Sequence, residues 1–193
     1  MCGLEVSAMQ VSRATKMLDE EFEKWRNRPI KESVRYLLLD ARYEKVRVDG
    51  SIVDWALLIA YGIQEDGRRR VLVVSVELSE AEVYWRKFLE SLSERGLYGL
   101  KMITSDNHAG LKAARQSVFP SVSWQRCQFH LQQNASSHIP KKSMEREAHE
   151  DIRNIFNMPS REEAEACLKR RLKNMKTRRL DLQNGLNMKS RKD

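Results

Sequence analysis

The chain has 193 residues, enough for one ordinary domain or one domain with an appendage, which excludes a large multi-domain protein. Hydrophobic residues make up 41% and charged residues 32%, a balance typical of a globular chain and not of a disordered or collagen-like one. No apolar stretch approaches the roughly 18 to 20 residues of a membrane-spanning helix, and the chain opens without a secretory leader, so we expect a cytoplasmic protein with no membrane partner. Three cysteines, at positions 2, 127 and 167, do not form a disulfide framework.

The net charge of +8 is confined to the end of the chain. Residues 1–165 carry 25 basic and 25 acidic side chains, whereas residues 166–193 carry 10 basic and 2 acidic ones. A basic tail is compatible with nonspecific phosphate contacts and equally with a solvated end that binds nothing. The charge alone therefore does not indicate a nucleic-acid partner.

The first predicted element is a helix over 6–28, where apolar and small side chains recur at helical spacing until Pro29. Its early part, from Val6 to Lys16, resembles the recognition half of a helix-turn-helix, with small polar and basic residues available to a DNA groove. An amphipathic helix that packs on the rest of the domain is the alternative, and for this segment alone we favour it.

From residue 35 the hydrophobic period changes to that of strands. The apolar run over 36–40 predicts a strand buried on both faces, and the runs over 52–63 and 71–76 predict a hairpin around a turn at 64–67. Ser79, with Glu82 three residues on, forms a capping box that predicts a helix ending near Arg95, before Gly96.

Strands and helices alternate further along the chain. The predicted elements are a strand at 101–105, a helix at 108–116, a strand at 122–127 and a helix from 130 onward. After Pro140 the sequence is charged and helix-favouring, and Ser160 with Glu163 starts a helix over 161–173. The order strand, strand, strand, helix, strand, helix, strand, helix predicts an α/β fold with a mixed sheet.

Two acids, Asp40 and Asp106, each directly follow a predicted strand. An aspartate at a strand end is often only a turn former or a helix N-cap. If the two strands are neighbours, however, the carboxylates converge at the edge of the sheet where ligands gather. Two hard oxygen ligands suit Mg²⁺, which keeps several waters and takes one or two carboxylates.

Three segments make the sequence recognisable. The stretches LDARYEKVR from Leu39, TSDNHAGL from Thr104 and WQRCQFHLQQNA from Trp124 resemble those of the mutator-type transposases of bacterial insertion sequences, in the same order along the chain. The resemblance implies a ribonuclease-H-like fold with three metal-binding acids: an Asp on the first strand, an Asp after the fourth and a Glu beyond an all-helical insertion. Asp40 and Asp106 match the first two acids, as catalytic and Mg²⁺- or Mn²⁺-binding residues.

The family also carries a Cys-x-x-His motif after the fifth strand, which Cys127 and His130 match. This spacing supports two zinc ligands, but a structural zinc site needs four, and only Cys2, Cys167 and distant histidines remain. We favour a buried cysteine, with His130 near the active site in a supporting or DNA-contacting role.

The sequence departs from the family in two places. Glu162, Glu163 and Glu165 come too early to be the third acid, so the catalytic Glu is missing. Residues 174–193 show no family pattern, and a frameshift after about Lys173 explains both departures. The predicted organisation is a helical remnant of a DNA-binding region (1–30), the ribonuclease-H-like core (31–139), a partial helical insertion (140–173) and an aberrant basic tail (174–193).

The leading hypothesis is a truncated transposase whose complete relatives cleave and join DNA strands with Mg²⁺ or Mn²⁺. Arg42, Lys45 and Arg126 are the candidate DNA-phosphate contacts. The alternative is a non-catalytic fragment that binds DNA, or that pairs with another copy or with an intact transposase and inhibits it. A decay product with no selected role is the third possibility.

Overall fold

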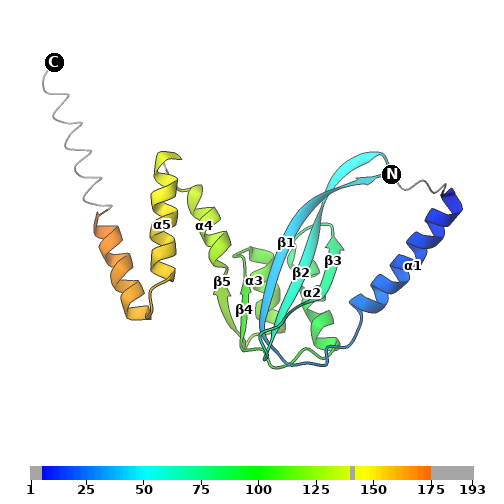
Figure 1. The fold of residues 1–193 in the computed structure, drawn as a ribbon, viewed down its shortest axis with the longest axis horizontal. Helices are drawn as coiled ribbons and strands as arrows, with labels where there is room; N and C mark the ends of the chain where they lie inside the picture. The colour runs from blue at the N-terminus through cyan, green and yellow to red at the C-terminus, as the bar shows by residue number, and fades with distance from the viewer. Residues whose placement is uncertain (1–5, 140–141, 175–193) are drawn as a thin grey trace, which may run out of the picture. The chain divides into compact units, whose positions relative to one another are not determined.

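The computed structural model describes residues 6–139 and 142–174 of the chain. It divides into two compact units, residues 1–127 and residues 128–193, which are described separately. Figure 1 shows a sheet together with α1, α2 and α3 in the first unit, and helices without strands in the second. Along the chain the elements follow one another as the sequence predicts: three strands, then helix, strand, helix, strand and helix.

The first unit is built on a five-stranded mixed sheet with the spatial order β3-β2-β1-β4-β5. The strands are β1 (Val34–Val48), β2 (Ser51–Gln64), β3 (Arg69–Glu77), β4 (Met102–Ser105) and β5 (Ser123–Arg126). β1, β2 and β3 pair antiparallel, whereas β4 runs parallel to β1 and β5 runs parallel to β4. The predicted α/β class and mixed sheet are confirmed.

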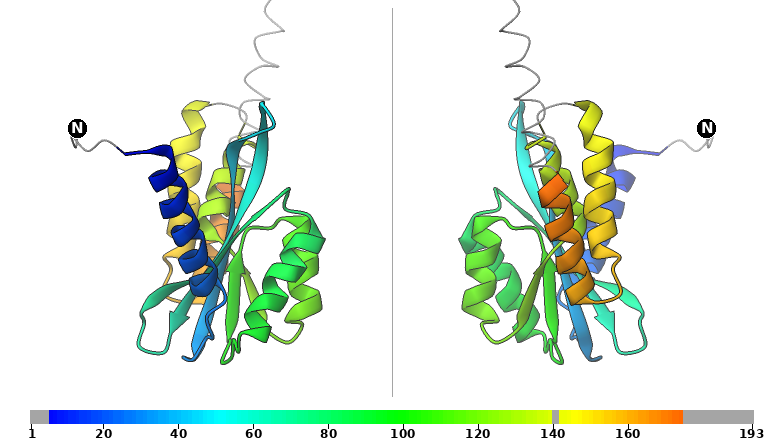
Figure 2. Two further views of the ribbon diagram at one scale, coloured as in Figure 1. Left: turned by 90° about the vertical axis from the view of Figure 1, so that its right-hand side faces the viewer. Right: turned by 90° about the vertical axis from the view of Figure 1, so that its left-hand side faces the viewer.

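Two helices, α2 (Glu82–Glu94) and α3 (Ala109–Val118), cover one face of this sheet (Figure 2). The core between them and the sheet consists of side chains at most 3% exposed: Leu37, Leu39, Leu58, Ala60, Ile103, Trp85, Phe88, Leu89, Leu92, Leu111 and Ala114. Each large aliphatic or aromatic side chain buried in this way contributes about 1.5–3 kcal/mol. The core therefore fixes the strands that carry the two acids.

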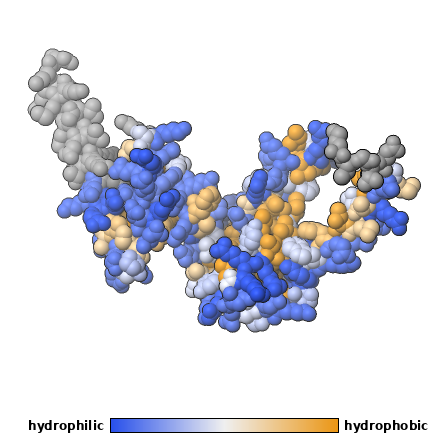
Figure 3. All heavy atoms as spheres, in the orientation of Figure 1, coloured by the Kyte–Doolittle hydropathy of each residue, from blue (hydrophilic) through white to orange (hydrophobic). Residues whose placement is uncertain are grey.

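The opposite face of the sheet is only partly covered, so the prediction that the strand over 36–40 is buried on both faces is wrong. Burial alternates along β1: Leu37 and Leu39 are buried, whereas Tyr36 is 36% exposed and Leu38 is half-buried. On β3, Val76 is 50% exposed. Figure 3 shows apolar side chains exposed over the middle of the sheet on this side.

Two connections between elements differ from the sequence prediction: the turn after β1 and the start of α2. β1 and β2 are joined by Asp49 and Gly50, which have φ values of 48° and 81°, as a two-residue hairpin turn requires. The predicted capping box at the start of α2 is absent, because the N-cap is Ala81 and the Ser79 hydroxyl accepts a hydrogen bond from the Ala81 backbone N–H at 3.3 Å instead. The predicted end of this helix is confirmed, with Arg95 as C-cap.

Helix α1 (Ala8–Arg26) starts at Ser7, whose hydroxyl and backbone N–H form a capping box with Gln10. The helix lies within the predicted range, but none of its residues is buried; Leu18 is 71% exposed and Phe22 is 44% exposed. The favoured packing of this helix on the rest of the domain is therefore not observed in the described structure.

Two arginines attach the segment after α1 to the sheet. Arg28 stacks on the Trp25 ring with its Cζ 4.6 Å from the centroid and donates to the carbonyl oxygen of Val71 at 2.9 Å. Arg95 donates to the carbonyl oxygens of Arg28 at 2.8 Å and Leu72 at 3.0 Å. Burial, and then the nearby charge of Arg28, lower the pKa of the Arg95 guanidinium. These bonds fix the segment before β1 against β3.

The second unit is helical, as predicted for the sequence after Pro140. It contains α4 (Gln128–Ser136), the 3₁₀ turn η1 (Lys142–Met144), α5 (Glu145–Phe156) and a helix over 161–174. The predicted cap at Ser160 is confirmed by a hydrogen bond from the Glu163 N–H to its hydroxyl at 3.2 Å. Arg171 bridges back to Asp151 on α5 at 2.9 Å. Among the described helices of the whole chain, none is long and apolar enough to cross a membrane.

Gly110, at the start of α3, lies directly against the backbone of the loop before α2. A Cβ at this position would overlap the carbonyl oxygen of Glu80 and lie 2.9 Å from the backbone nitrogen of Glu82. Because backbone atoms cannot rotate away as a side chain does, Gly110→Ala is expected to lower the free energy of unfolding by about 1–3 kcal/mol. Chemical denaturation of the two proteins measures this difference.

Ala113 provides the matched control for this substitution, because it lies on the same helix and is exposed. Ala113→Ser is expected to change the free energy of unfolding by only about 0.5 kcal/mol, the difference in helix propensity. Equal stability of the Gly110→Ala and Ala113→Ser proteins would show that the two backbones are not in tight contact.

Candidate active site

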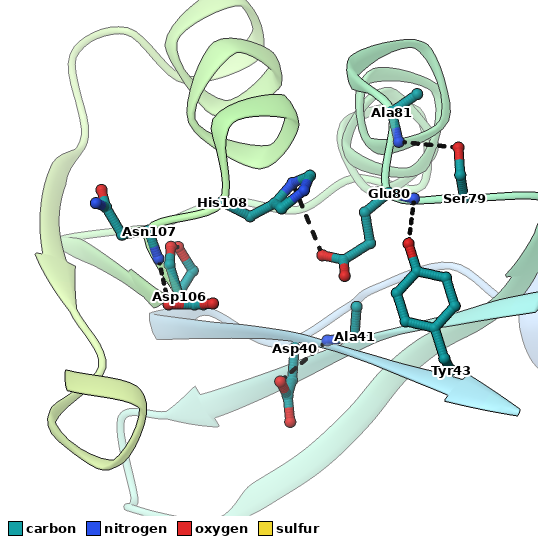
Figure 4. Close-up of polar contacts among 10 residues, drawn as sticks. Asp40, Ala41, Tyr43, Ser79, Glu80, Ala81, Asp106, Asn107 and His108 are labelled. Atoms are coloured by element: carbon teal, nitrogen blue, oxygen red, sulfur yellow. Dashed lines mark hydrogen bonds and ion pairs between the residues drawn. The ribbon is translucent and has the colours of Figure 1, made fainter. Parts of the chain in front are cut away.

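Asp40 and Asp106 come from neighbouring parallel strands and lie at the same level of the sheet (Figure 4). In the ladder between β1 and β4, the last pair is Leu39 with Ser105. Each aspartate follows its member of that pair by one residue, so both carboxylates leave the ladder at its end. The spatial order of the strands therefore brings together two acids that are 66 positions apart in the sequence.

The prediction that Asp40 ends its strand is wrong, because β1 continues to Val48. From Ala41 onward β1 has no further ladder with β4, although residues 41–43 still lie beside β2 and β3 in the sheet. From Glu44 onward β1 and β2 form a two-stranded extension that ends at the Asp49–Gly50 turn. Asp40 therefore lies at the end of the parallel part of β1 rather than at the end of the strand. For Asp106, the predicted position directly after β4 is confirmed.

Local hydrogen bonds hold both carboxylates in place. Oδ1 of Asp40 accepts from the Ala41 N–H at 3.0 Å, and Oδ1 of Asp106 accepts from the Asn107 N–H at 2.6 Å. Asp40 is exposed and Asp106 is partly buried, so both remain accessible to a ligand from solvent. Two hard oxygen donors of this kind suit one Mg²⁺ or Mn²⁺ ion that keeps several of its waters.

Across residues 6–139 and 142–174, no three acidic, histidine or cysteine side chains are placed to hold one metal ion together. The two aspartates thus offer two candidate oxygen donors, and the described residues add no third. Pairs of metal ions in phosphoryl transfer need carboxylates that bridge and flank both ions. The donor set present fits one cation better than two.

A second polar pair, which sequence reasoning missed, lies at the rim of this site. Glu80, in the loop between β3 and α2, has a side chain only 18% exposed, and its Oε2 lies 3.9 Å from Nδ1 of His108. The Tyr43 hydroxyl of β1 accepts a hydrogen bond from the Glu80 N–H at 3.4 Å. Figure 4 shows Glu80 and His108 on the side of α2 and α3, near the end of the β1–β4 ladder, where Asp40 and Asp106 lie.

The three predicted DNA contacts lie in different environments. On β1, Arg42 shares the face of Asp40 by strand alternation, and its Nε lies 2.5 Å from Oε1 of Glu44. By the same alternation Lys45, which is exposed, lies on the opposite face. Arg126 ends β5 opposite Ser105 and is partly buried, and its Nε finds no hydrogen-bond partner among the described residues.

Cys127 and His130 belong to different units. Cys127 is the last residue of the first unit; its thiol is free and partly buried, so the expectation of a buried cysteine is not met. Its backbone N–H donates to the carbonyl oxygen of Ser105 at 2.7 Å. His130 lies on α4 of the second unit, where its ring meets that of Phe129 edge-on at 5.4 Å.

The fold and the site define an α/β protein with two carboxylates side by side at the end of a parallel strand pair. The family model described as "Transposase, Mutator family" matches residues 1–183. The chain therefore belongs to the Mutator family of transposases, as its three sequence motifs predict.

Similar curated proteins are transposases of bacterial insertion sequences. The chain is 56% identical over 166 residues to the transposase for insertion sequence element IS406 of Burkholderia multivorans, covering 86% of this chain and 42% of that protein. It is 41% identical over 168 residues to the transposase for ISRM5 of Rhizobium meliloti, and 38% identical over 157 residues to the transposase for IS256 in transposon Tn4001 of Staphylococcus aureus. These matches cover 87% and 81% of this chain and 42% and 40% of the relatives, so the chain spans less than half the length of the proteins it matches.

Solved structures are less similar to the chain. The Drosophila P element transposase strand transfer complex matches with a TM-score of 0.35 at 12% identity, covering 70% of this chain and 44% of that one. The HTLV-2 integrase catalytic core domain in complex with magnesium matches with a TM-score of 0.32 at 12% identity, covering 63% of this chain and 84% of that one.

Proposed function

We propose that the chain contains most of the ribonuclease-H-like catalytic core of a DDE-type DNA transposase, with Asp40 and Asp106 as the first two of its three acids. The observation that carries this proposal is the register of β1 and β4, which places the two carboxylates one residue beyond the same ladder pair. The family to which the chain belongs supports the same reading of the reaction as cleavage and transfer of DNA strands.

The cofactor in this proposal is Mg²⁺ or Mn²⁺, which when bound would polarise the scissile phosphate. Asp40 and Asp106 would hold the cation through their carboxylate oxygens, and Oδ1 of each also accepts a hydrogen bond from the backbone N–H of the next residue. Arg42, Lys45 and Arg126 would contact phosphates of the bound DNA, the partner of the site. Arg42 would have to exchange its contact with Glu44 for such a phosphate.

The polypeptide itself is proposed to lack strand-cleavage activity. No described residue completes a three-ligand group with the two aspartates, and Glu162, Glu163 and Glu165 come too early in the chain to match the family's third acid. Without it the metal site is incomplete, and the rate of cleavage is expected to fall by orders of magnitude.

The same observation favours a second function, from a different class. A two-acid site of this kind retains DNA and cation binding without cleavage, and the chain then acts as a DNA-binding fragment or pairs with another copy or with an intact transposase and inhibits it. In both versions residues 1–30 are the remnant of the DNA-binding region, 31–139 the core and 140–173 a partial insertion. The tail over 174–193, proposed to result from a frameshift, lies outside the described residues apart from Asn174.

The nucleotide sequence of the gene tests the frameshift. A second reading frame after codon 173 that encodes a family-like helix would support it, and its absence would refute it. The family match extends to residue 183, inside the proposed tail, which counts against a boundary as early as Lys173.

An assay with insertion-sequence end DNA and Mn²⁺ tests the function. The chain is expected to bind the DNA with an affinity that falls steeply with salt, and to show the same background cleavage as its Asp40→Ala variant. Arg126→Ala is expected to lower the slope of log affinity against log salt by about one, whereas the matched control Lys87→Ala, on exposed α2 surface, leaves it unchanged. Cleavage that Asp40→Ala abolishes would refute the proposed inactivity, and binding that ignores salt would refute the DNA interface.

A further inference from the structure

The backbone at Asp106 is held by side chains, because strand pairing ends just before it. β4 has only four residues, and its ladder with β1 stops at Ser105. The Ser105 hydroxyl donates a hydrogen bond to the carbonyl oxygen of Asp106 at 2.8 Å. The same hydroxyl accepts a hydrogen bond from the indole Nε1–H of Trp124 at 2.9 Å. These two bonds form a relay from β5 to Asp106.

Ser105 is one of the few buried polar residues of the described chain, with an exposed fraction of 1%. A buried hydroxyl needs partners, and here its single donor and one acceptor lone pair are both used within the relay. Its backbone carbonyl is also satisfied, by the Cys127 N–H at 2.7 Å. A serine at the end of β4 thus ties the first residue after the ladder to the neighbouring strand.

Trp124 is itself fixed from the other side. Its ring packs against the hydrophobic core, and two cations of α3 lie against it: Nζ of Lys112 and Cζ of Arg115, each 5.9 Å from the ring centroid. The indole therefore has little freedom to leave Ser105. The chain of contacts runs from α3 through Trp124 and Ser105 to the backbone of Asp106.

We propose that Ser105 and Trp124 are positioning residues of the two-acid site, which keep Asp106 level with Asp40 where the ladder no longer does so. This inference rests on the proposed function, since it concerns the cation held by the two aspartates. Contacts behind a metal ligand typically change metal affinity about 10- to 100-fold when removed; because this relay acts through the backbone of Asp106, we expect the lower end of that range or less.

The test is Mn²⁺ affinity of the full chain, measured by calorimetry, in Trp124→Phe and Ser105→Ala. Each substitution is expected to weaken binding about three- to tenfold. Because both residues act in one relay, the double variant should bind no more weakly than the worse single variant. In wild type, Mn²⁺ should broaden the NMR signal of the Trp124 Nε1–H more than those of the other indoles.

Trp85→Phe is the matched control, because Trp85 is fully buried and its Nε1 has no hydrogen-bond partner among the described residues. It makes the same chemical change in the same core and should leave Mn²⁺ affinity unchanged. Thermal melting confirms that each variant is folded, and if Ser105→Ala is not, Trp124→Phe decides alone because it retains the aromatic ring.

The outcomes separate the two proposals. If Asp40→Asn abolishes Mn²⁺ binding but Trp124→Phe binds Mn²⁺ as tightly as Trp85→Phe, the metal site stands. The positioning role of Trp124 would then be overturned. Absence of Mn²⁺ binding by wild type would overturn the metal site of the proposed function. The relay is supported if Trp124→Phe weakens Mn²⁺ binding and Trp85→Phe does not.

Discussion

Asp106→Asn is expected to lower the affinity of the chain for Mn²⁺ at least about tenfold, and Asp40→Asn to do the same. The amide keeps the size of the side chain and an oxygen that can accept the N–H of Asn107, but it removes the negative charge that a divalent cation requires. The described residues offer two carboxylates at the proposed site, so loss of either leaves a single charged ligand there. Calorimetric or paramagnetic-resonance titration measures both affinities.

Asp54 on β2 is the control acid, since it is exposed and pairs with Lys45 on the two-stranded extension, beyond the parallel ladder. Asp54→Asn changes the net charge by the same amount and should leave the affinity within experimental error. If all three variants lost affinity equally, the effect would be that of overall charge, and Asp40 and Asp106 would not form a site.

The position of Asp106 could be predicted from the sequence, and that of Asp40 only in part. An apolar run followed by Asp and a helix marks the end of β4 unambiguously, because the strand is short and buried. β1 carries no such stop after Asp40: residues 41–48 contain no Gly or Pro, alternate apolar and charged side chains except at Glu44-Lys45, and continue as strand. Asp49-Gly50 is the turn signal that locates the true end, and its φ values of 48° and 81° show why those two residue types are needed.

The sequence predicts that the two acids lie close together if their strands are neighbours in the sheet, but it does not predict that the strands are neighbours. Sequence patterns give the order of strands along the chain, whereas the neighbour of β1 in the sheet depends on which hydrophobic faces pack under α2 and α3. The Glu80–His108 pair shows the same limit. Glu80 directly follows the predicted cap Ser79, where an acid is typical of the first turn of a helix. The close approach of Gly110 to the backbone of Glu80 is a tertiary contact that the sequence does not predict.

Burial of the first strand on both faces was the expectation that failed most clearly. A run of consecutive apolar residues, as over 36–39, is typical of a strand covered on both sides, yet Tyr36 is 36% exposed. An apolar run indicates that both faces of the strand favour burial, but it does not show whether the described residues cover both faces. The exposed apolar side chains over the sheet in Figure 3 are the physical counterpart of that discrepancy.

A chimera gives the largest expected change in activity. In this chimera, residues 1–173 are joined to the part of the Burkholderia multivorans IS406 transposase that lies beyond its matched region, where the proposed function places the third acid. At 56% identity over 166 residues, the two sheets should present similar surfaces to that segment. We expect Mn²⁺-dependent cleavage of end DNA at least about 100-fold above that of the present chain, because a third acid completes the site.

The chimera should also be more stable, since packing on the open face would cover side chains such as Tyr36 and Val76, which are 36% and 50% exposed. Burying two such side chains contributes a few kcal/mol at about 25 cal/mol per Å² of apolar area. The matched control is the same chimera with Asp40→Ala, which should share the added stability and show no cleavage. If the stable chimera cleaves DNA and the cleavage does not depend on Asp40, the reaction takes place elsewhere than at the two-acid site. If the stable chimera shows no cleavage, adding a third acid is not enough to restore activity.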